Sequence, residues 1–179
     1  MIACPKAETD AASVSEILQH EEQKSFRVCF VCTGNTCRSP MAAAVANAMA
    51  KERQTPLEAL SRGLYANDGE PISPHAEEAL EMAEVAVVQS HDYHRHTAHT
   101  LSEEDVENAD LLVGMSGSHC MELLLRYPQA AQRITAMPSP ISDPFGGDLA
   151  VYCACLAEIT EGIRTLLFSS SEPKDEATK

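Results

Sequence analysis

The sequence lacks a long apolar run. No hydrophobic stretch approaches the roughly 18 residues that a helix needs to cross a membrane, so we expect neither a membrane-spanning segment nor a membrane partner. The opening residues, Met1–Lys6, also lack the apolar stretch of a secretory signal. We therefore expect a cytoplasmic protein.

Positive charge is scarce as well. Lys and Arg number 13 against 27 Asp and Glu, which gives a formal net charge of -14. Such a chain repels nucleic acid at long range, so we expect no nucleic-acid partner. It repels phosphorylated molecules for the same reason. Any phosphate site must therefore be a local positive focus within a negative molecule.

The cysteines do not form a disulfide framework. Their number, seven, is odd and they are scattered along the chain, which argues for a reducing compartment. Cys153 and Cys155 are two apart on a predicted helix, so we expect them to point to opposite sides and to pack.

A histidine-rich stretch lacks the partners of a metal site. Metal binding is the alternative interpretation of these side chains, but no cysteines or carboxylates at ligand spacing accompany them. We therefore expect an exposed loop, no metal and no cofactor. The residues are His91, His94, His96 and His99.

Apolar residues make up 44% of the 179, enough for one domain with a single core. Buried-strand patterns alternate with helical ones, which predicts an α/β fold with three layers: helices on both faces of a four-stranded parallel sheet. We expect this domain over 25–168, an N-terminal extension over 1–24 that is a short helix or disordered, and a disordered tail over 169–179. Strands are predicted at 26–31, 57–60, 111–115 and 133–136, and helices at 41–51, after Ser73, after Ser102, at 118–127 and from Asp148.

The most informative segment is Cys32–Pro40, with the sequence CTGNTCRSP. It follows a predicted strand and precedes a predicted helix, so it lies where parallel sheets bind ligands. The helix N-terminus, the guanidinium of Arg38 and a hydrogen bond from Ser39 favour the thiolate of Cys32, which is the nucleophilic form.

The same segment is suited to hold a phosphoryl group. Successive backbone N–H groups form an anion nest, and an arginine fork matches two phosphate oxygens. We expect Gly34 to permit the tight path and Asn35 to adopt left-handed backbone angles. A nucleotide-binding P-loop is excluded because Gly-Lys-Ser/Thr is missing. The remaining alternative is a strand-turn-helix connection with an incidental Cys and Arg.

Cys32–Pro40 resembles the signature loop of the low-molecular-weight protein tyrosine phosphatase family. A second match lies at Asp143–Gly147, with the sequence DPFGG, and the resemblance covers about residues 26–168. It implies metal-independent hydrolysis of a phosphorylated protein through a phosphocysteine on Cys32. Arg38 would stabilise the phosphoryl oxygens, and Asp143 would act as general acid and then as base, rather than only as a turn aspartate. The implied substrate-binding residues are Thr33, Gly34, Asn35, Thr36, Cys37, Ser39 and Phe145.

Thr36 bears on which phosphorylated side chain is the substrate. Protein arginine phosphatases resemble this chain in carrying threonine there together with Asp-Pro-Phe-Gly-Gly, whereas tyrosine-directed members often carry a bulky aliphatic residue. A small polar side chain suits a guanidinium, and an aliphatic one suits a phenyl ring. We therefore expect protein phosphoarginine as the substrate, with phosphotyrosine as the alternative.

Two other functions remain open. Arsenate reductases with a cysteine relay share this loop, and Cys120 keeps that alternative open, but we find no further cysteine pair over 63–110. A phosphate-binding module without turnover is disfavoured because Cys32 and Asp143 are both present.

The resemblance also suggests a reversible disulfide between Cys32 and Cys37 that protects the nucleophile from over-oxidation. The alternative is that Cys37 is simply a packed thiol. We expect a monomer.

Overall fold

The computed structural model describes residues 24–169. The extension predicted over 1–24 and the tail predicted over 169–179 lie outside these residues, apart from one residue of each. None of the helices over 24–169 is both long and apolar enough to span a bilayer.

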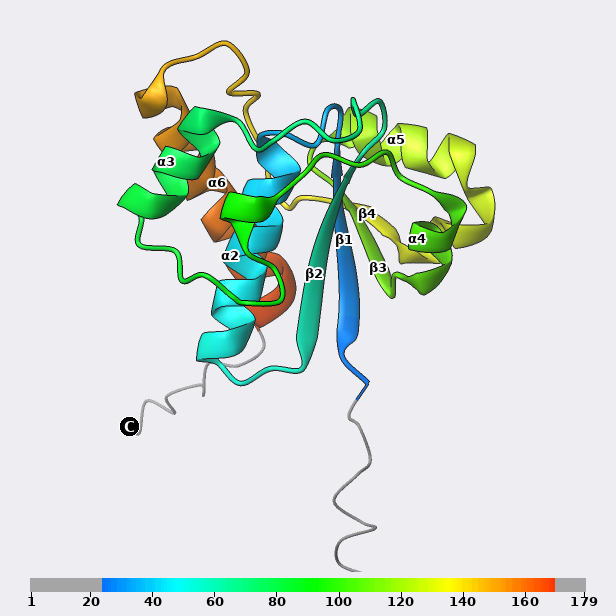
Figure 1. Cartoon of the computed structure of the whole chain (residues 1–179). Coiled ribbons are helices and arrows are strands. Elements are labelled where there is room, and N and C mark those ends of the chain that lie inside the picture. Colours follow the sequence, from blue (N-terminus) through cyan, green and yellow to red (C-terminus); the bar gives the residue numbers. More distant parts are fainter. Residues whose placement is uncertain (1–23, 170–179) are drawn as a thin grey trace, which may run out of the picture.

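Four parallel strands form the central sheet (Figure 1). They lie in the spatial order β2-β1-β3-β4, and β1 pairs with both β2 and β3. The predicted α/β class and four-stranded parallel sheet are confirmed. The strands are β1 (Phe26–Cys32), β2 (Leu57–Gly63), β3 (Leu111–Gly114) and β4 (Ile134–Ala136).

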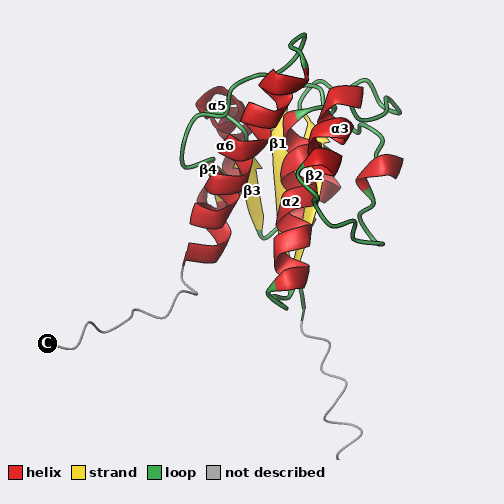
Figure 2. Ribbon diagram, turned by 90° about the vertical axis from the view of Figure 1, so that its left-hand side faces the viewer, coloured by secondary structure: helices red, strands yellow, loops and turns green. Residues whose placement is uncertain are grey.

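Helices cover both faces of this sheet. Three of them, α2 (Arg38–Glu52), α3 (Pro74–Met82) and α6 (Leu149–Phe168), pack together on one face, and Figure 2 looks onto them. Two others, α4 (Glu103–Asn108) and α5 (Gly117–Arg126), lie on the opposite face. The remaining helical turns are the 3-10 helices η1 (Tyr93–Arg95) and η2 (Pro128–Arg133).

The sheet divides the core in two, and β1 is buried on both sides. Val28 and Phe30 point into the larger core beneath α2, α3 and α6, whereas Cys29 and Val31 point into the smaller core. All four are at most 1% exposed, which is why β1 is a continuous apolar run rather than an alternating one. Burial raises the pKa of the Cys29 thiol to about 12, so this cysteine is a packing residue.

Strand β2 is longer than its sequence pattern suggests. The Ser-Arg-Gly run was expected to end it after Leu60, yet residues 61–63 continue the strand in register with the last three residues of β1. Pairing with a fully buried neighbour therefore overrides the local turn signal. As a consequence β1 and β2 end side by side, directly beneath the loop that follows β1.

The predicted helix ends are mostly confirmed. Ser102 and Asp105 form a capping box, and Asp148 caps α6. Ser73 occupies the N-cap position of α3, but its hydroxyl donates to the Tyr152 hydroxyl (3.1 Å) instead of capping the helix. Helix α5 starts and ends one residue earlier than predicted.

The apolar residues of α6 are buried to different extents. Cys155 and Phe168 are buried, whereas Leu149, Cys153 and Leu166 are only partly buried. The Cys155 thiol bonds to a loop carbonyl, and burial raises its pKa to about 12. Both cysteines of this helix therefore pack, as expected.

Candidate active site

The loop over residues 33–37 joins the carboxyl end of β1 to the N-terminus of α2. Neighbouring segments fix its carbonyl groups: Leu64 N donates to Cys32 O (2.9 Å), Tyr65 N to Thr33 O (2.9 Å) and Ser73 N to Thr36 O (2.8 Å). These bonds fix the path of the loop between β1 and the start of α2. An anion nest formed by its amide groups stays a prediction.

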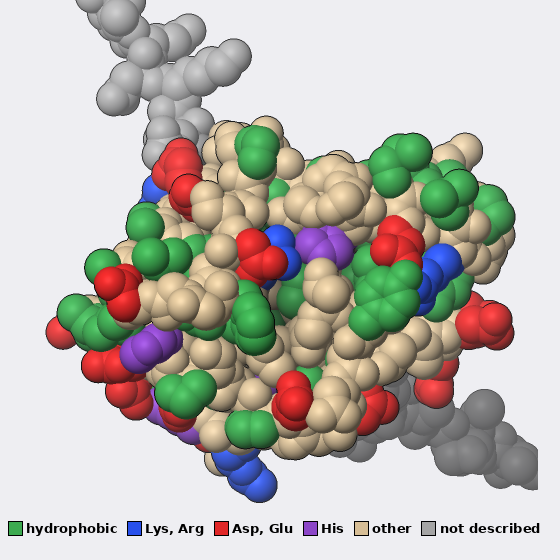
Figure 3. Space-filling view, turned by 90° about the horizontal axis from the view of Figure 1, so that it is seen from above, with side chains coloured by type: hydrophobic (Ala, Val, Ile, Leu, Met, Phe, Trp, Pro, Cys, Tyr) green, Lys and Arg blue, Asp and Glu red, His purple; other side chains and the backbone are tan. Residues whose placement is uncertain are grey.

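A pocket of about 280 Å³ opens above this loop. Seen from this end, the surface has a small basic spot at its centre, surrounded by acidic and apolar side chains (Figure 3). Arg38 is the single Lys or Arg among the lining residues, and Asp143 pairs with it, so a local positive focus stays a prediction. The lining residues are Cys32, Thr33, Gly34, Asn35, Thr36, Cys37, Arg38, Glu70, Asp143 and Phe145.

Cys32 lies at the floor of the pocket and is 3% exposed. Its sulfur is 2.9 Å from Ser39 Oγ and accepts a hydrogen bond from the Asn35 amide at 3.3 Å. Ser39 Oγ is itself 3.3 Å from the carbonyl oxygen of Arg62. The predicted contact between the Ser39 hydroxyl and the sulfur is therefore present.

Arg38 and Asp143 meet across the pocket, although 105 positions separate them. Arg38 is buried at the first position of α2, and its Nη2 donates to Asp143 Oδ2 at 2.7 Å. The other carboxylate oxygen of Asp143 accepts a hydrogen bond from the Phe145 amide at 3.2 Å. This bond closes the turn over residues 143–145. This ion pair brings the predicted phosphate-binding arginine and the predicted general acid together at one pocket.

Asn35 is the structural centre of the loop. It is completely buried, and with a φ of 58° it adopts the left-handed conformation predicted for it. Its Nδ2 donates to Ser39 Oγ (2.9 Å) and Ser61 Oγ (3.0 Å), and its Oδ1 accepts from His99 N (2.9 Å). Gly34 does not have a positive φ, and a Cβ there would meet only one atom, at an ordinary 3.9 Å. The expectation that Gly34 permits the tight path is therefore wrong: Asn35 makes the turn.

Cys37 contacts a tyrosine of the last helix. Its sulfur is 3.3 Å from the Tyr152 hydroxyl, which also accepts from Ser73 Oγ. Burial, together with the hydrogen bond to Cys37, raises the pKa of Tyr152 to about 12. Both Cys32 and Cys37 are free thiols in the structure, and a disulfide between them stays a prediction.

His119 contacts the loop through Thr33, and no sequence pattern indicated this role. Its ring joins Thr33 Oγ1 (Nε2, 2.9 Å) to Ser116 Oγ (Nδ1, 2.6 Å), and the side chain is buried. Burial, reinforced by the nearby Arg38 guanidinium, lowers the pKa of His119. A neutral imidazole therefore positions the loop without adding charge to the site.

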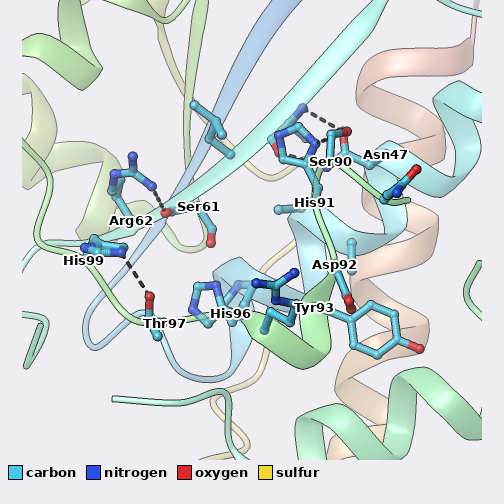
Figure 4. A pocket seen from close by; sticks show the side chains of 17 residues that line it. Asn47, Ser61, Arg62, Ser90, His91, Asp92, Tyr93, His96, Thr97 and His99 are labelled. Atoms are coloured by element: carbon cyan, nitrogen blue, oxygen red, sulfur yellow. Dashed lines mark hydrogen bonds between the residues drawn. The ribbon is translucent and has the colours of Figure 1, made fainter. Parts of the chain in front are cut away.

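A second pocket of about 320 Å³ lies between α2, β2 and the histidine stretch, and His91, His96 and His99 line it (Figure 4). His96 Nε2 lies 2.8 Å from the carbonyl oxygen of Asn35, and burial lowers the His96 pKa. The expectation of a simply exposed loop is therefore wrong for this residue. His96 and the His99 amide together fix Asn35 to the 93–99 segment.

Carboxylates do accompany one of these histidines, contrary to the expectation. His94 Nδ1 lies 2.7 Å from Glu77 and 3.7 Å from Glu81, both on α3, and one ligand atom of each residue lies within 4.8 Å of the others. The spacing of residues along the sequence did not predict this cluster, because the two carboxylates come from a separate helix. The hydrogen bond that His94 donates to Glu77 raises the pKa of His94, so protonated His94 and Glu77 form an ion pair. His91 instead pairs with Glu58 at 3.3 Å.

A buried cysteine, a buried arginine and a carboxylate line one pocket at the carboxyl edge of a parallel sheet, an arrangement that fits a phosphatase. The chain belongs to the low molecular weight phosphotyrosine protein phosphatase family, whose sequence profile matches residues 27–177.

Relatives within this family carry two kinds of name. A protein-arginine-phosphatase of Bacillus subtilis is 32% identical over 146 residues, which cover 78% of this chain and 93% of the relative. A low molecular weight protein-tyrosine-phosphatase, PtpB of Staphylococcus haemolyticus, is 37% identical over 134 residues, covering 71% and 87%. A solved structure of a YwlE arginine phosphatase mutant matches with a TM-score of 0.71 at 30% identity, covering 78% and 92%. The similarity is thus shared between arginine- and tyrosine-directed enzymes.

Proposed function

We propose that this protein hydrolyses phosphoarginine in proteins through a phosphocysteine intermediate on Cys32. The observation that carries the chemistry is the pairing of Arg38 with Asp143 in the pocket that Cys32 also lines. One side chain binds phosphoryl oxygens and the other is placed at the pocket mouth, where a leaving group departs.

In the first step the phosphoryl group replaces the Asp143 carboxylate on Arg38. The Cys32 thiolate attacks phosphorus, the bond from phosphorus to the leaving nitrogen breaks, and protonated Asp143 gives its proton to that nitrogen. The loop amides and Arg38 hold the three remaining phosphoryl oxygens while their charge develops.

In the second step water attacks the phosphocysteine. The Asp143 carboxylate takes a proton from the water, the new oxygen bonds to phosphorus, and the bond from phosphorus to sulfur breaks. Cys32 leaves as a thiolate, which the hydroxyl of Ser39 stabilises by donating a hydrogen bond. In the YwlE mutant structure the active-site serine is phosphorylated, which supports a covalent intermediate at this loop.

Phosphoarginine is favoured by the loop and by one of the relatives. Thr36 presents a small polar side chain to the pocket, and a protein-arginine-phosphatase is 32% identical to this chain. Phosphotyrosine is the second candidate, because Phe145 is 80% exposed at the pocket mouth and is able to stack on a phenyl ring.

The test compares two peptides of one sequence that carry either phosphoarginine or phosphotyrosine. We expect kcat/KM to favour phosphoarginine by at least about tenfold, and the Cys32→Ser variant to lose hydrolysis of both peptides and of para-nitrophenyl phosphate. Asp143→Asn should cost about 10²- to 10⁴-fold on phosphoarginine, and less on para-nitrophenyl phosphate, whose leaving group needs little help from an acid. A clear preference for phosphotyrosine would replace the substrate assignment, and full turnover in Cys32→Ser would refute the mechanism.

A further inference from the structure

A third charged side chain lines the active-site pocket beside Arg38 and Asp143. Glu70 belongs to the turn that follows β2, and neither the signature loop nor the Asp-Pro motif includes it. Glu70 is exposed, whereas Cys32 and Arg38 of the same pocket, which we propose to bind the phosphoryl group, are buried. A second carboxylate there calls for an explanation, since it repels the phosphoryl group that the floor attracts.

The backbone holds Glu70 firmly at this place. Its amide donates to Asn67 O (3.1 Å), and its carbonyl accepts from Ala98 N (2.7 Å). Gly69, with a φ of 93°, makes the turn and donates from its own amide to Ala98 O (2.9 Å). The turn is therefore fixed to the 97–100 segment, and part of the same segment anchors the phosphate loop.

The side chain is held at one oxygen only. Glu70 Oε1 accepts from Asn67 Nδ2 at 2.8 Å, and within residues 24–169 no hydrogen bond is found for Oε2. The residue is exposed. One oxygen is thus oriented by the turn while the other is available to a ligand in the pocket.

We propose that Glu70 accepts a hydrogen bond from the guanidinium of phosphoarginine and makes the site selective for a cationic leaving group. This inference rests on the proposed function. A phosphorylated guanidinium keeps its positive charge beside the phosphoryl group, and a carboxylate pairs well with it through charge-assisted hydrogen bonds. The neutral ring of phosphotyrosine offers no such compensation, so for that substrate Glu70 leaves only the repulsion of the phosphate.

The experiment changes the charge of Glu70 while keeping its shape. Glu70→Gln retains an oxygen for Asn67 Nδ2, and Glu70→Lys reverses the charge. The control is Glu78→Gln, which removes an exposed carboxylate on α3 that pairs with His75 (3.6 Å) and does not line the pocket. Each variant is assayed on the matched phosphoarginine and phosphotyrosine peptides and on para-nitrophenyl phosphate.

We expect Glu70→Gln to lower the kcat/KM ratio of phosphoarginine to phosphotyrosine about fivefold, mainly through KM, and Glu70→Lys to lower it further. The control should keep the parental ratio, and para-nitrophenyl phosphate should be hydrolysed by both Glu70 variants at least as well as by the parent. If the parent prefers phosphoarginine and both variants keep its ratio, this inference is wrong while the proposed function stands. If the parent prefers phosphotyrosine, the proposed function fails and the inference fails with it.

Discussion

The hydroxyl of Ser39 has one proton and two acceptors within reach. The Cys32 sulfur is 2.9 Å away and the Arg62 carbonyl oxygen 3.3 Å away. While Cys32 is a thiol, it donates to Ser39, and Ser39 donates to the carbonyl. Once Cys32 is a thiolate, Ser39 turns its proton to the sulfur. Asn35 Nδ2 donates to Ser39 Oγ in both states and keeps the hydroxyl in place.

Removing the Ser39 hydroxyl tests whether its hydrogen bond stabilises the Cys32 thiolate. We expect Ser39→Ala to lower kcat about 10- to 100-fold, because a hydrogen bond to a charged sulfur contributes about 1.5–3 kcal/mol. Alkylation of Cys32 by iodoacetamide near neutral pH should slow as well, since less thiolate is present. The matched control is Ser90→Ala, which removes an exposed hydroxyl that bonds to His91. Parental alkylation and turnover in Ser39→Ala would show that the sulfur does not depend on this bond.

At the scale of elements, the end of β2 fits closely beneath the phosphate loop. A Cβ added at Gly63 would lie 2.7 Å from the Thr33 carbonyl oxygen and 2.8 Å from the Ala66 Cβ. Backbone on one side and a short side chain on the other leave no flexible atom to move aside. Glycine is therefore required here for the close approach of two chain segments, and the loop depends on it.

Two glycine-to-alanine variants measure this fit. Gly63→Ala should destabilise the fold by about 1–3 kcal/mol and lower turnover, because the added methyl pushes against Thr33. Gly117→Ala is the control, since a Cβ at this first residue of α5 meets nothing within 4 Å, and we expect stability to be equal or slightly higher. Urea unfolding and para-nitrophenyl phosphate assays compare the two. Equal stability and activity in both variants would contradict the close approach.

The elements were predictable to the extent that their signals are local. The apolar run of β1, the capping box at Ser102 and the left-handed Asn35 all depend on residues within a few positions, and the structure shows each of them. The last three residues of β2 are in the strand because they pair with β1. The local sequence of β2 carries no information about that pairing.

The supports of the site depend on distant partners. His96 reaches Asn35 across 61 positions, and His119 reaches Thr33 across 86. No periodicity or motif links residues that far apart, so the sequence alone did not single out either histidine as a support, nor Glu70 as a lining residue. Arg38 and Asp143 were assigned to one site only because the resemblance includes both motifs, and their ion pair was not predicted.

For the whole molecule, buried His119 and half-buried His96 make the stability of the active-site scaffold depend on pH. Burial lowers the pKa of His96, and burial with the Arg38 guanidinium lowers that of His119, both from the ordinary value near 6.5. Between the folded pKa and about 6.5, the unfolded chain binds protons that the folded protein does not. Stability is therefore complete above about pH 6.5 and is lost as the pH falls towards the folded pKa values.

His119→Gln isolates one part of this dependence. An amide is able to bridge Thr33 and Ser116 but does not titrate, so we expect the variant to lose some stability at pH 7.5 and to lose less than the parent on going to pH 5.5. The free energy of unfolding in urea at a series of pH values measures both effects. His75→Gln, at an exposed position on α3, should follow the parent. If His119 had only a structural role, His119→Gln would lower the free energy of unfolding equally at every pH. An unchanged dependence of this free energy on pH in the variant would therefore exclude His119 as the titrating group.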